Sequence, residues 1–147
     1  MNFEDTLSRK ASARRARLGA LVAEDDRATR NLITTILERE GFEVHGVPDG
    51  QNAIDLVKKS DFALIILDVL MPGIDGFGVL RYIRQYRPST IRRIIVTTAM
   101  PPAEVEAFCE GEVCQILPKP FDVTRLAQIA KECAADEAEV SSEPITD

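Results

Sequence analysis

The sequence contains no long run of apolar residues. A membrane-spanning helix needs about 20 predominantly apolar residues, and no segment of the 147-residue chain approaches that length. The first residues also lack the apolar stretch of a secretory signal. We therefore expect a cytoplasmic protein without membrane insertion.

Cysteine and histidine are scarce. The chain has three cysteines without CxxC spacing and a single histidine, which are too few and too dispersed for a zinc centre. We expect Cys109, Cys114 and Cys133 to be buried, reduced thiols. His45 falls on a predicted edge strand, where we expect it to be exposed rather than to carry a phosphoryl group.

Basic residues are outnumbered by acidic ones, which gives a net charge of −6. A nucleic-acid-binding surface needs clustered lysine and arginine, so we expect no nucleic-acid partner. The charge is uneven, because residues 1–17 carry a net charge of +3 and residues 134–147 a net charge of −5. Neither segment holds enough apolar residues to fold by itself. We predict a flexible basic N-terminal extension at 1–17, one globular domain at 18–135 and a flexible acidic tail at 136–147.

Short apolar runs alternate with amphipathic helical patterns through the central domain. The predicted strands are LGALVA (18–23), FEVHGV (42–47), FALIILDV (62–69), RRIIVTT (92–98) and VCQIL (113–117). The predicted helices are TRNLITTILERE (29–40), NAIDLVKK (52–59), FGVLRYIRQY (77–86), a short helix after residue 102, and DVTRLAQIAKECAA (122–135). The third strand lacks polar alternation, as expected for a central parallel strand covered on both faces. The pattern predicts an α/β fold with a doubly wound, five-stranded parallel sheet and five helices.

Polar residues follow the predicted strands at the end where ligands of doubly wound sheets bind. Glu24 and Asp25 follow the first strand, and Asp68 follows the apolar run of the third. Thr98 ends the fourth strand and Lys119 follows the fifth. Three crowded carboxylates raise one another's pKa unless a divalent cation neutralises them. Mg²⁺ suits a site with few protein oxygens better than Ca²⁺ does.

Asp68 beside that cation is a candidate nucleophile toward a phosphoryl donor. The Lys119 ammonium and the Thr98 hydroxyl can each contact a phosphoryl oxygen. Thr97 competes for the second role, and we favour Thr98 because strand alternation turns its neighbour to the other face. Asp26 has a simpler interpretation as the N-cap of the following helix.

Four motifs in this order resemble the receiver domain of bacterial two-component response regulators across about residues 18–135. They are EDD (24–26), LDVLMPGIDG (67–76), TTA (97–99) and KPF (119–121). The resemblance implies a flavodoxin-like fold with strand order 2-1-3-4-5 and a cis Lys119-Pro120 bond. It also implies a single-domain protein similar to chemotaxis regulators, because the residues after 135 are too few for an output domain.

The resemblance assigns roles to the strand-end residues. Four residues would bind Mg²⁺ through oxygen, namely the carboxylates of Glu24, Asp25 and Asp68 and the backbone carbonyl of Leu70. Asp68 would be the phosphoacceptor, while Thr98 and Lys119 would sense the phosphoryl group. The implied partners are a histidine kinase or histidine phosphotransferase and a downstream protein target, with the chain a monomer or a weak phosphorylation-dependent dimer. Such a protein is not a conventional enzyme, although it catalyses its own aspartyl phosphorylation and dephosphorylation.

The sequence departs from the family pattern at Ile116, where receivers usually carry Tyr or Phe. An aliphatic side chain cannot make the usual aromatic swing, which leaves open how a signal leaves the domain. Leu70 and Met100 are apolar and should flank the path of the hydrolytic water, so we expect slow self-dephosphorylation.

The leading hypothesis is a single-domain response regulator that signals by phosphorylation-dependent protein binding or by passing the phosphoryl group along a phosphorelay. The alternative is a phosphorylation-independent, receiver-like binding module, which Ile116 keeps open. A phosphatase of the haloacid dehalogenase class would need a second aspartate two residues after Asp68, where the sequence has Leu70.

Overall fold

The computed structural model describes residues 18–135, and in this range the chain forms one five-stranded parallel sheet. The strands are β1 (Gly19–Ala23), β2 (Glu43–Val47), β3 (Leu64–Asp68), β4 (Ile94–Thr98) and β5 (Gln115–Pro118). Their order across the sheet is β2-β1-β3-β4-β5, and every neighbouring pair is parallel. The predicted doubly wound sheet and its strand order are therefore confirmed. The predicted extension at 1–17 and tail at 136–147 lie outside the described residues.

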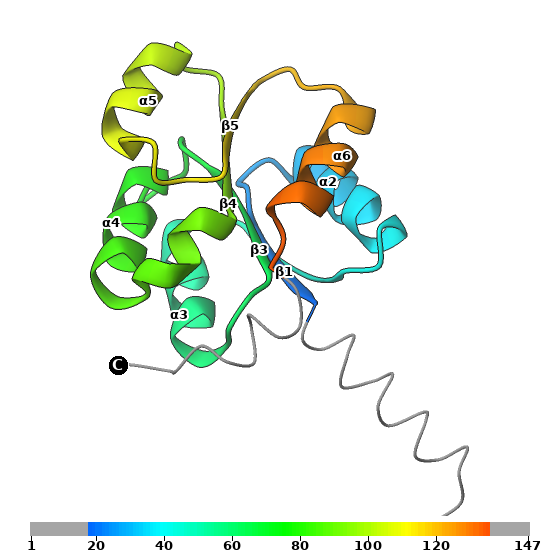
Figure 1. The fold of residues 1–147 in the computed structure, drawn as a ribbon, viewed down its shortest axis with the longest axis horizontal. Helices are drawn as coiled ribbons and strands as arrows, with labels where there is room; N and C mark the ends of the chain where they lie inside the picture. Colours follow the sequence, from blue (N-terminus) through cyan, green and yellow to red (C-terminus); the bar gives the residue numbers. More distant parts are fainter. Residues whose placement is uncertain (1–17, 136–147) are drawn as a thin grey trace, which may run out of the picture.

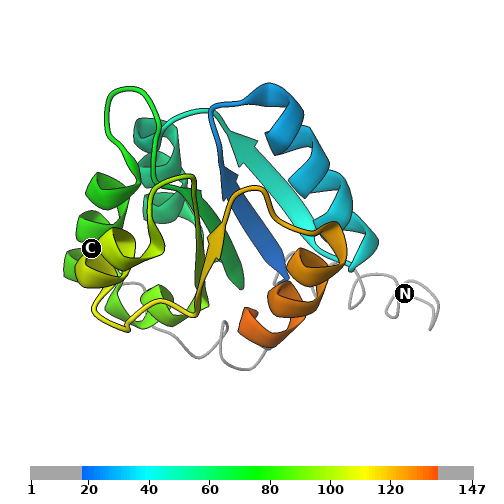
Figure 2. The same ribbon diagram turned by 90° about the horizontal axis from the view of Figure 1, so that it is seen from above.

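Five α-helices within residues 18–135 cover both faces of the sheet, as Figures 1 and 2 show. Helices α2 (Arg27–Arg39) and α6 (Val123–Cys133) lie on one face. Helices α3 (Gly50–Lys59), α4 (Gly76–Tyr86) and α5 (Pro102–Cys109) lie on the other. One further element, the 3-10 helix η1 (Pro88–Arg93), was not predicted, because the sequence pattern placed the start of the fourth strand at Arg92.

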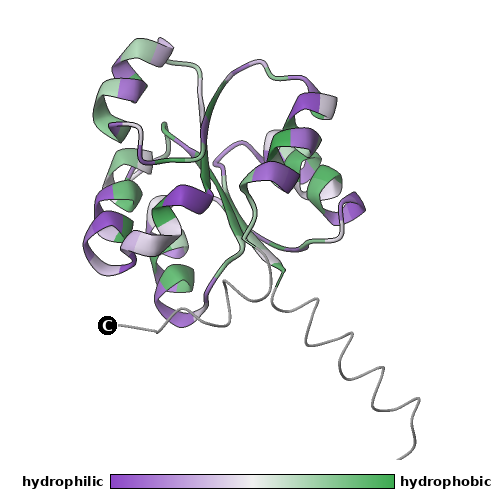
Figure 3. Ribbon diagram, in the orientation of Figure 1, coloured by the Kyte–Doolittle hydropathy of each residue, from purple (hydrophilic) through white to green (hydrophobic). Residues whose placement is uncertain are grey.

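Side-chain alternation along the strands divides the core into two layers. In β1, Leu21 and Ala23 face α3, α4 and α5, whereas Ala20 and Val22 face α2 and α6. All residues of β1, β3 and β4 are buried, which explains their continuous apolar runs. Figure 3 shows the apolar residues concentrated along the strands and hydrophilic residues on the outer turns of the helices. Edge strand β2 is more exposed, and His45 on it is exposed as predicted.

Four helices begin with an aspartate N-cap whose carboxylate accepts a hydrogen bond from a backbone N–H of the first turn. The caps are Asp26 of α2, Asp49 of α3, Asp75 of α4 and Asp122 of α6. Each of these helices follows a strand, so the caps fix the loops at the carboxyl edge of the sheet. The interpretation of Asp26 as an N-cap is confirmed.

The prediction that all three cysteines are reduced thiols is wrong. Cys114 and Cys133 form a disulfide with a Cα–Cα distance of 5.8 Å, although they are separated by 19 residues in sequence. Helix α6 runs back along the sheet after β5, so its last residue comes to lie beside the residue before β5. This return brings the two thiols within bonding distance, and no local spacing in the sequence marks it. Cys109 is free and buried, as predicted.

Within the described part of the chain, none of the helices combines the length and apolar content that crossing a bilayer requires.

Candidate functional site

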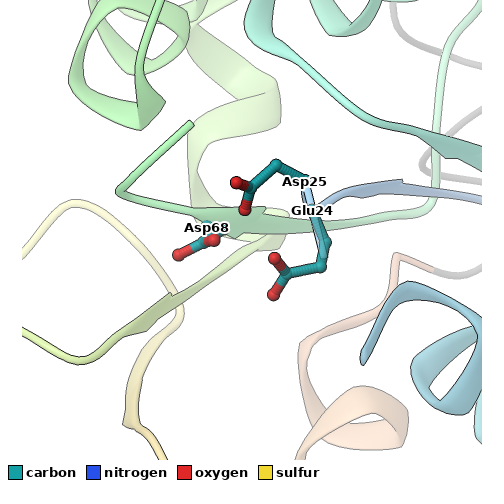
Figure 4. Close-up of side chains that lie close together, drawn as sticks. All are labelled: Glu24, Asp25 and Asp68. Carbon is teal, nitrogen blue, oxygen red and sulfur yellow. The ribbon is translucent and has the colours of Figure 1, made fainter. Parts of the chain in front are cut away.

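Three carboxylates converge at the carboxyl edge of the sheet (Figure 4). Glu24 and Asp25 follow β1, and Asp68 is the last residue of the adjacent strand β3. One oxygen from each of the three side chains lies within 4.8 Å of the others. Glu24 and Asp68 are buried, whereas Asp25 is exposed. This all-oxygen donor set, open to solvent on one side, fits a hard divalent cation such as Mg²⁺.

Lys119 balances part of this negative charge. Its Nζ lies 2.7 Å from Glu24 Oε1 and 3.2 Å from Asp68 Oδ2. Burial lowers the pKa of Lys119, but the hydrogen bond to Glu24 and the charge of Asp68 outweigh it, so the pKa lies above its ordinary value. The ammonium is therefore protonated at neutral pH, between two carboxylates.

The backbone around Lys119 ties β5 to β4 at the site. The Lys119 N–H donates to the carbonyl oxygen of Thr98 at 2.7 Å. The Lys119-Pro120 bond is cis, as the family resemblance implied. The side chain of Lys119 thus starts directly beside the end of β4 and reaches across the end of β3.

Both carboxylate oxygens of Glu24 accept a hydrogen bond. Its Oε2 accepts a hydrogen bond from the N–H of Asp26 at 3.1 Å, and its Oε1 accepts one from Lys119. Each oxygen keeps a second lone pair for a cation. Asp25 is exposed, so the position of its carboxylate depends on the backbone that carries it.

The loop after Asp68 folds tightly back on the strand. The N–H of Gly76 donates to the carbonyl oxygen of Val69 at 2.8 Å, and a Cβ added to Gly76 would overlap the carbonyl oxygen of Asp68. Only glycine permits this approach. Gly73 has a φ of +72° in the same loop, which explains the glycines of the MPGIDG segment.

Both threonines at the end of β4 are buried. Thr97 pairs with Asp68 in the sheet register, so Thr98 extends one residue beyond Asp68 at the edge where the carboxylates lie. The Thr98 hydroxyl oxygen accepts a hydrogen bond from the N–H of Met100 at 2.9 Å. The hydroxyl of Thr97 has no hydrogen-bond partner among the described residues. The choice of Thr98 stays a prediction.

With this geometry established, comparison with known proteins gives the family. The sequence model of the response regulator receiver domain matches residues 20–131. The chain belongs to this receiver family. Such domains are the phosphoryl-accepting parts of two-component systems, and they bind Mg²⁺ at an acidic cluster and interact with histidine kinases or phosphotransferases.

Among characterised relatives, the receiver is similar to the transcriptional regulatory protein SrrA of Staphylococcus aureus. The two are 35% identical over 103 residues, which are 69% of this chain and 41% of SrrA. The chain thus spans about two fifths of the length of the curated relatives it matches.

Three solved structures illustrate the similarity of fold. The receiver domain of Francisella response regulator 1452 is 26% identical, with a TM-score of 0.70 over 78% of this chain and 94% of that one. The chemotaxis response regulator CheY4 of Vibrio cholerae is 25% identical, with a TM-score of 0.70 over 78% and 97%. The receiver domain of the Pseudomonas aeruginosa sensor kinase PA1611 is 26% identical, with a TM-score of 0.70 over 79% and 96%, and is described with a magnesium ion in its active-site cleft.

The structure brings Glu24, Asp25, Asp68 and Lys119 into one site. Leu70 lies beside it and is 55% exposed, and its N–H is 3.4 Å from Asp68 Oδ1. The role of its carbonyl oxygen as a metal ligand stays a prediction.

Sequence reasoning missed Arg30. Its guanidinium Nη1 donates to the carbonyl oxygen of Glu24 at 2.8 Å. Arg30 lies one turn into α2, four residues after the Asp26 cap. From the sequence, an arginine at this position is expected to be an ordinary surface residue. Nothing in the local pattern indicates that its side chain reaches back to the acidic pair.

Proposed function

We propose that this receiver accepts a phosphoryl group on Asp68 with the help of a bound Mg²⁺. One observation carries the proposal: the Asp68 carboxylate lies within 4.8 Å of two other acidic groups and 3.2 Å from the Lys119 ammonium. A buried carboxylate in this position can accept a phosphoryl group, because the Lys119 ammonium and a bound Mg²⁺ can balance the added negative charge.

The residues present fit the cation. Glu24, Asp25 and Asp68 would hold Mg²⁺, with the backbone carbonyl of Leu70 as a further predicted ligand. When bound, the ion supplies positive charge that neutralises the oxygens of the transferred phosphoryl group.

Asp68 acts as the nucleophile. One carboxylate oxygen forms a bond to phosphorus while the bond from phosphorus to the donor's leaving atom breaks, which leaves an acyl phosphate on Asp68 and releases the donor. The donor is a phosphohistidine of a histidine kinase or histidine phosphotransferase.

Lys119 and Thr98 respond to the new charge. The ammonium of Lys119, held between Glu24 and Asp68 in the unphosphorylated protein, donates to a phosphoryl oxygen after transfer. The Thr98 hydroxyl, whose oxygen accepts from the N–H of Met100, donates its own proton to another phosphoryl oxygen. These exchanges favour one of two conformations, which a downstream protein partner reads.

The signal leaves the domain without the usual aromatic residue on β5. Ile116 pairs with Val96 in the register and is partly buried against the core. The signal therefore reaches the α5–β5 surface through packing of an aliphatic side chain. Phosphorylation-dependent binding of a protein partner and onward transfer in a phosphorelay are the two outputs compatible with such a site.

The test is intact mass spectrometry after incubation with acetyl phosphate and Mg²⁺. Wild type should gain about 80 Da, one phosphoryl group, and the gain should vanish on chelation of the metal and in Asp68→Asn. Asp75→Asn is the matched control, because Asn also caps helices and Asp75 lies on the same loop without belonging to the cluster. The Asp75→Asn protein should gain the same mass as wild type.

Two results would overturn the proposal. A mass gain that persists in Asp68→Asn would place the phosphoryl group on another residue. No gain in wild type under any condition would favour the phosphorylation-independent binding module instead.

A further inference from the structure

Arg30 contacts the main chain of both acidic residues that follow β1. From the first turns of α2, its Nη1 donates to the carbonyl oxygen of Glu24 at 2.8 Å and lies 3.4 Å from that of Asp25. The first bond is short and charge-assisted, which makes it one of the stronger classes of hydrogen bond in proteins. One side chain thus restrains two consecutive residues of the cation site.

A glycine on the edge strand makes room for this arginine. The aliphatic stem of Arg30 crosses β2 at Gly46, where an added Cβ would lie 3.3 Å from both Cγ and Cδ of Arg30. Such a distance is tighter than ordinary van der Waals contact, so any larger residue at position 46 would push the stem outward. Gly46 pairs with Val22 in the sheet register, two residues before Glu24.

Glu24 is consequently fixed through both of its peptide groups. Its N–H donates to the carbonyl oxygen of Val47 on β2 at 3.0 Å, and its carbonyl oxygen accepts from Arg30. Asp25 comes next in the chain. Its carboxylate is exposed, so the backbone that carries it, together with its own side-chain rotamer, determines whether it points at Asp68.

We propose that Arg30 is a positioning residue for the cation site. It holds the main chain of Glu24 and Asp25 so that the Asp25 carboxylate already lies close to that of Asp68 in the cation-free protein. This inference rests on the proposed function, because it assigns Arg30 a role in binding the Mg²⁺ that phosphoryl transfer uses. Supporting groups of this kind typically change metal affinity by about 10-fold to 100-fold when they are removed.

The sign of the effect separates positioning from simple electrostatics. Arg30 carries a positive charge near a site for a cation, so its repulsion alone opposes Mg²⁺ binding. Removing only that charge would make Mg²⁺ bind more tightly. Loss of positioning would make Mg²⁺ bind more weakly, and a purely structural role would lower the stability of the fold while leaving the affinity unchanged.

The experiment measures the affinity of the full-length, unphosphorylated protein for Mg²⁺ alone by isothermal titration calorimetry. Arg30→Met keeps the length of the stem and removes the donors, and we expect Mg²⁺ affinity to fall by about tenfold. Arg27→Met is the matched control, since Arg27 begins the same helix, is exposed and carries the same charge. Its Mg²⁺ affinity should equal or slightly exceed that of wild type.

A second variant keeps the test sharp if Arg30→Met folds poorly. Gly46→Ala retains the Arg30 guanidinium but displaces the stem of Arg30 by a few tenths of an ångström. It should therefore weaken Mg²⁺ binding less than Arg30→Met does. In an Arg30→Ala background the stem is gone, and Gly46→Ala should then have no further effect.

Each outcome bears on one claim. If wild type binds Mg²⁺ and folded Arg30→Met binds it equally or more tightly, the positioning role is refuted while the proposed function stands. If wild type binds no Mg²⁺, there is no cation site to position, and the Mg²⁺-dependent function fails with the inference. Phosphorylation by acetyl phosphate is assayed separately by intact mass. It shows whether the proposed function holds when the positioning role of Arg30 is refuted.

Discussion

Reducing the disulfide between Cys114 and Cys133 should lower the free energy of unfolding by about 3 kcal/mol. The bond closes a loop across a separation of 19 residues. Because the cross-link restricts the unfolded chain, a loop of this length contributes about 3 kcal/mol at room temperature. The folded protein loses little on reduction, since Cys133 stays packed at the end of α6 with Leu126, Ile129 and Ala130. For a domain of this size the change corresponds to a drop in Tm of about 10 °C.

The assay is urea unfolding followed by far-ultraviolet circular dichroism, with and without a phosphine reductant. The matched control is Cys114→Ser, which lacks the cross-link from the start and should show the same stability in both buffers. In the folded protein Cys109 should not exchange with the disulfide, because its thiol is buried and burial raises its pKa, which keeps it in the unreactive protonated form.

Two results would refute the reasoning about the disulfide. In the first, alkylation shows a single free thiol in the oxidised sample, which proves that the disulfide is formed, and yet wild type has the same free energy of unfolding with and without the reductant. The other is three alkylated thiols in unfolded protein that was never reduced, which would mean that the cross-link does not form.

Four further perturbations test the site and its supports. Lys119→Met should lower the free energy of unfolding by about 3 kcal/mol, because the carboxylate of Glu24 is fully buried and loses its cation; equal stability in denaturant titrations would contradict this. The pKa of Lys119 is raised on folding, so its stabilising effect is complete below its unfolded value of 10.5 and disappears as the pH rises through the folded value; alkaline unfolding titrations should show this loss in wild type and not in Lys119→Met. Leu70→Glu should speed decay of the Asp68 phosphoryl group by about tenfold, because a carboxylate beside the site can orient water; an unchanged decay of the phosphorylated mass would count against it. Asp122→Ala should cost about 1 kcal/mol by removing the cap of α6, which thermal unfolding would detect.

Much of the candidate site could be predicted from the order of residues along the chain. In a parallel sheet the carboxyl ends of all strands meet at one edge, so residues that end different strands become neighbours whatever their separation in sequence. Glu24 and Lys119 are far apart in the chain, yet both follow strands, and they meet at 2.7 Å. Asp68 ends β3, one of the two strands that lie between them in the sheet. The position of each residue relative to its strand was sufficient information.

Residues that act across elements were harder to predict. The disulfide joins the residue before β5 to the end of α6, and its formation depends on the angle and length with which the helix returns along the sheet. The contact of Arg30 with Glu24 depends on a long side chain that bends back over Gly46. Hydrophobic periodicity reports which face of an element is buried, and it contains no information on such distances.

The sequence by itself therefore determined the alternation of strands and helices, the doubly wound sheet and the cluster of acids at its carboxyl edge, because these follow from periodicity and from the geometry that all parallel sheets share. The tertiary structure alone decided that Cys114 and Cys133 are cross-linked and that Arg30 holds the backbone of Glu24. Those contacts depend on how separate elements pack and how far individual side chains reach, and these quantities are fixed only once the whole chain has folded.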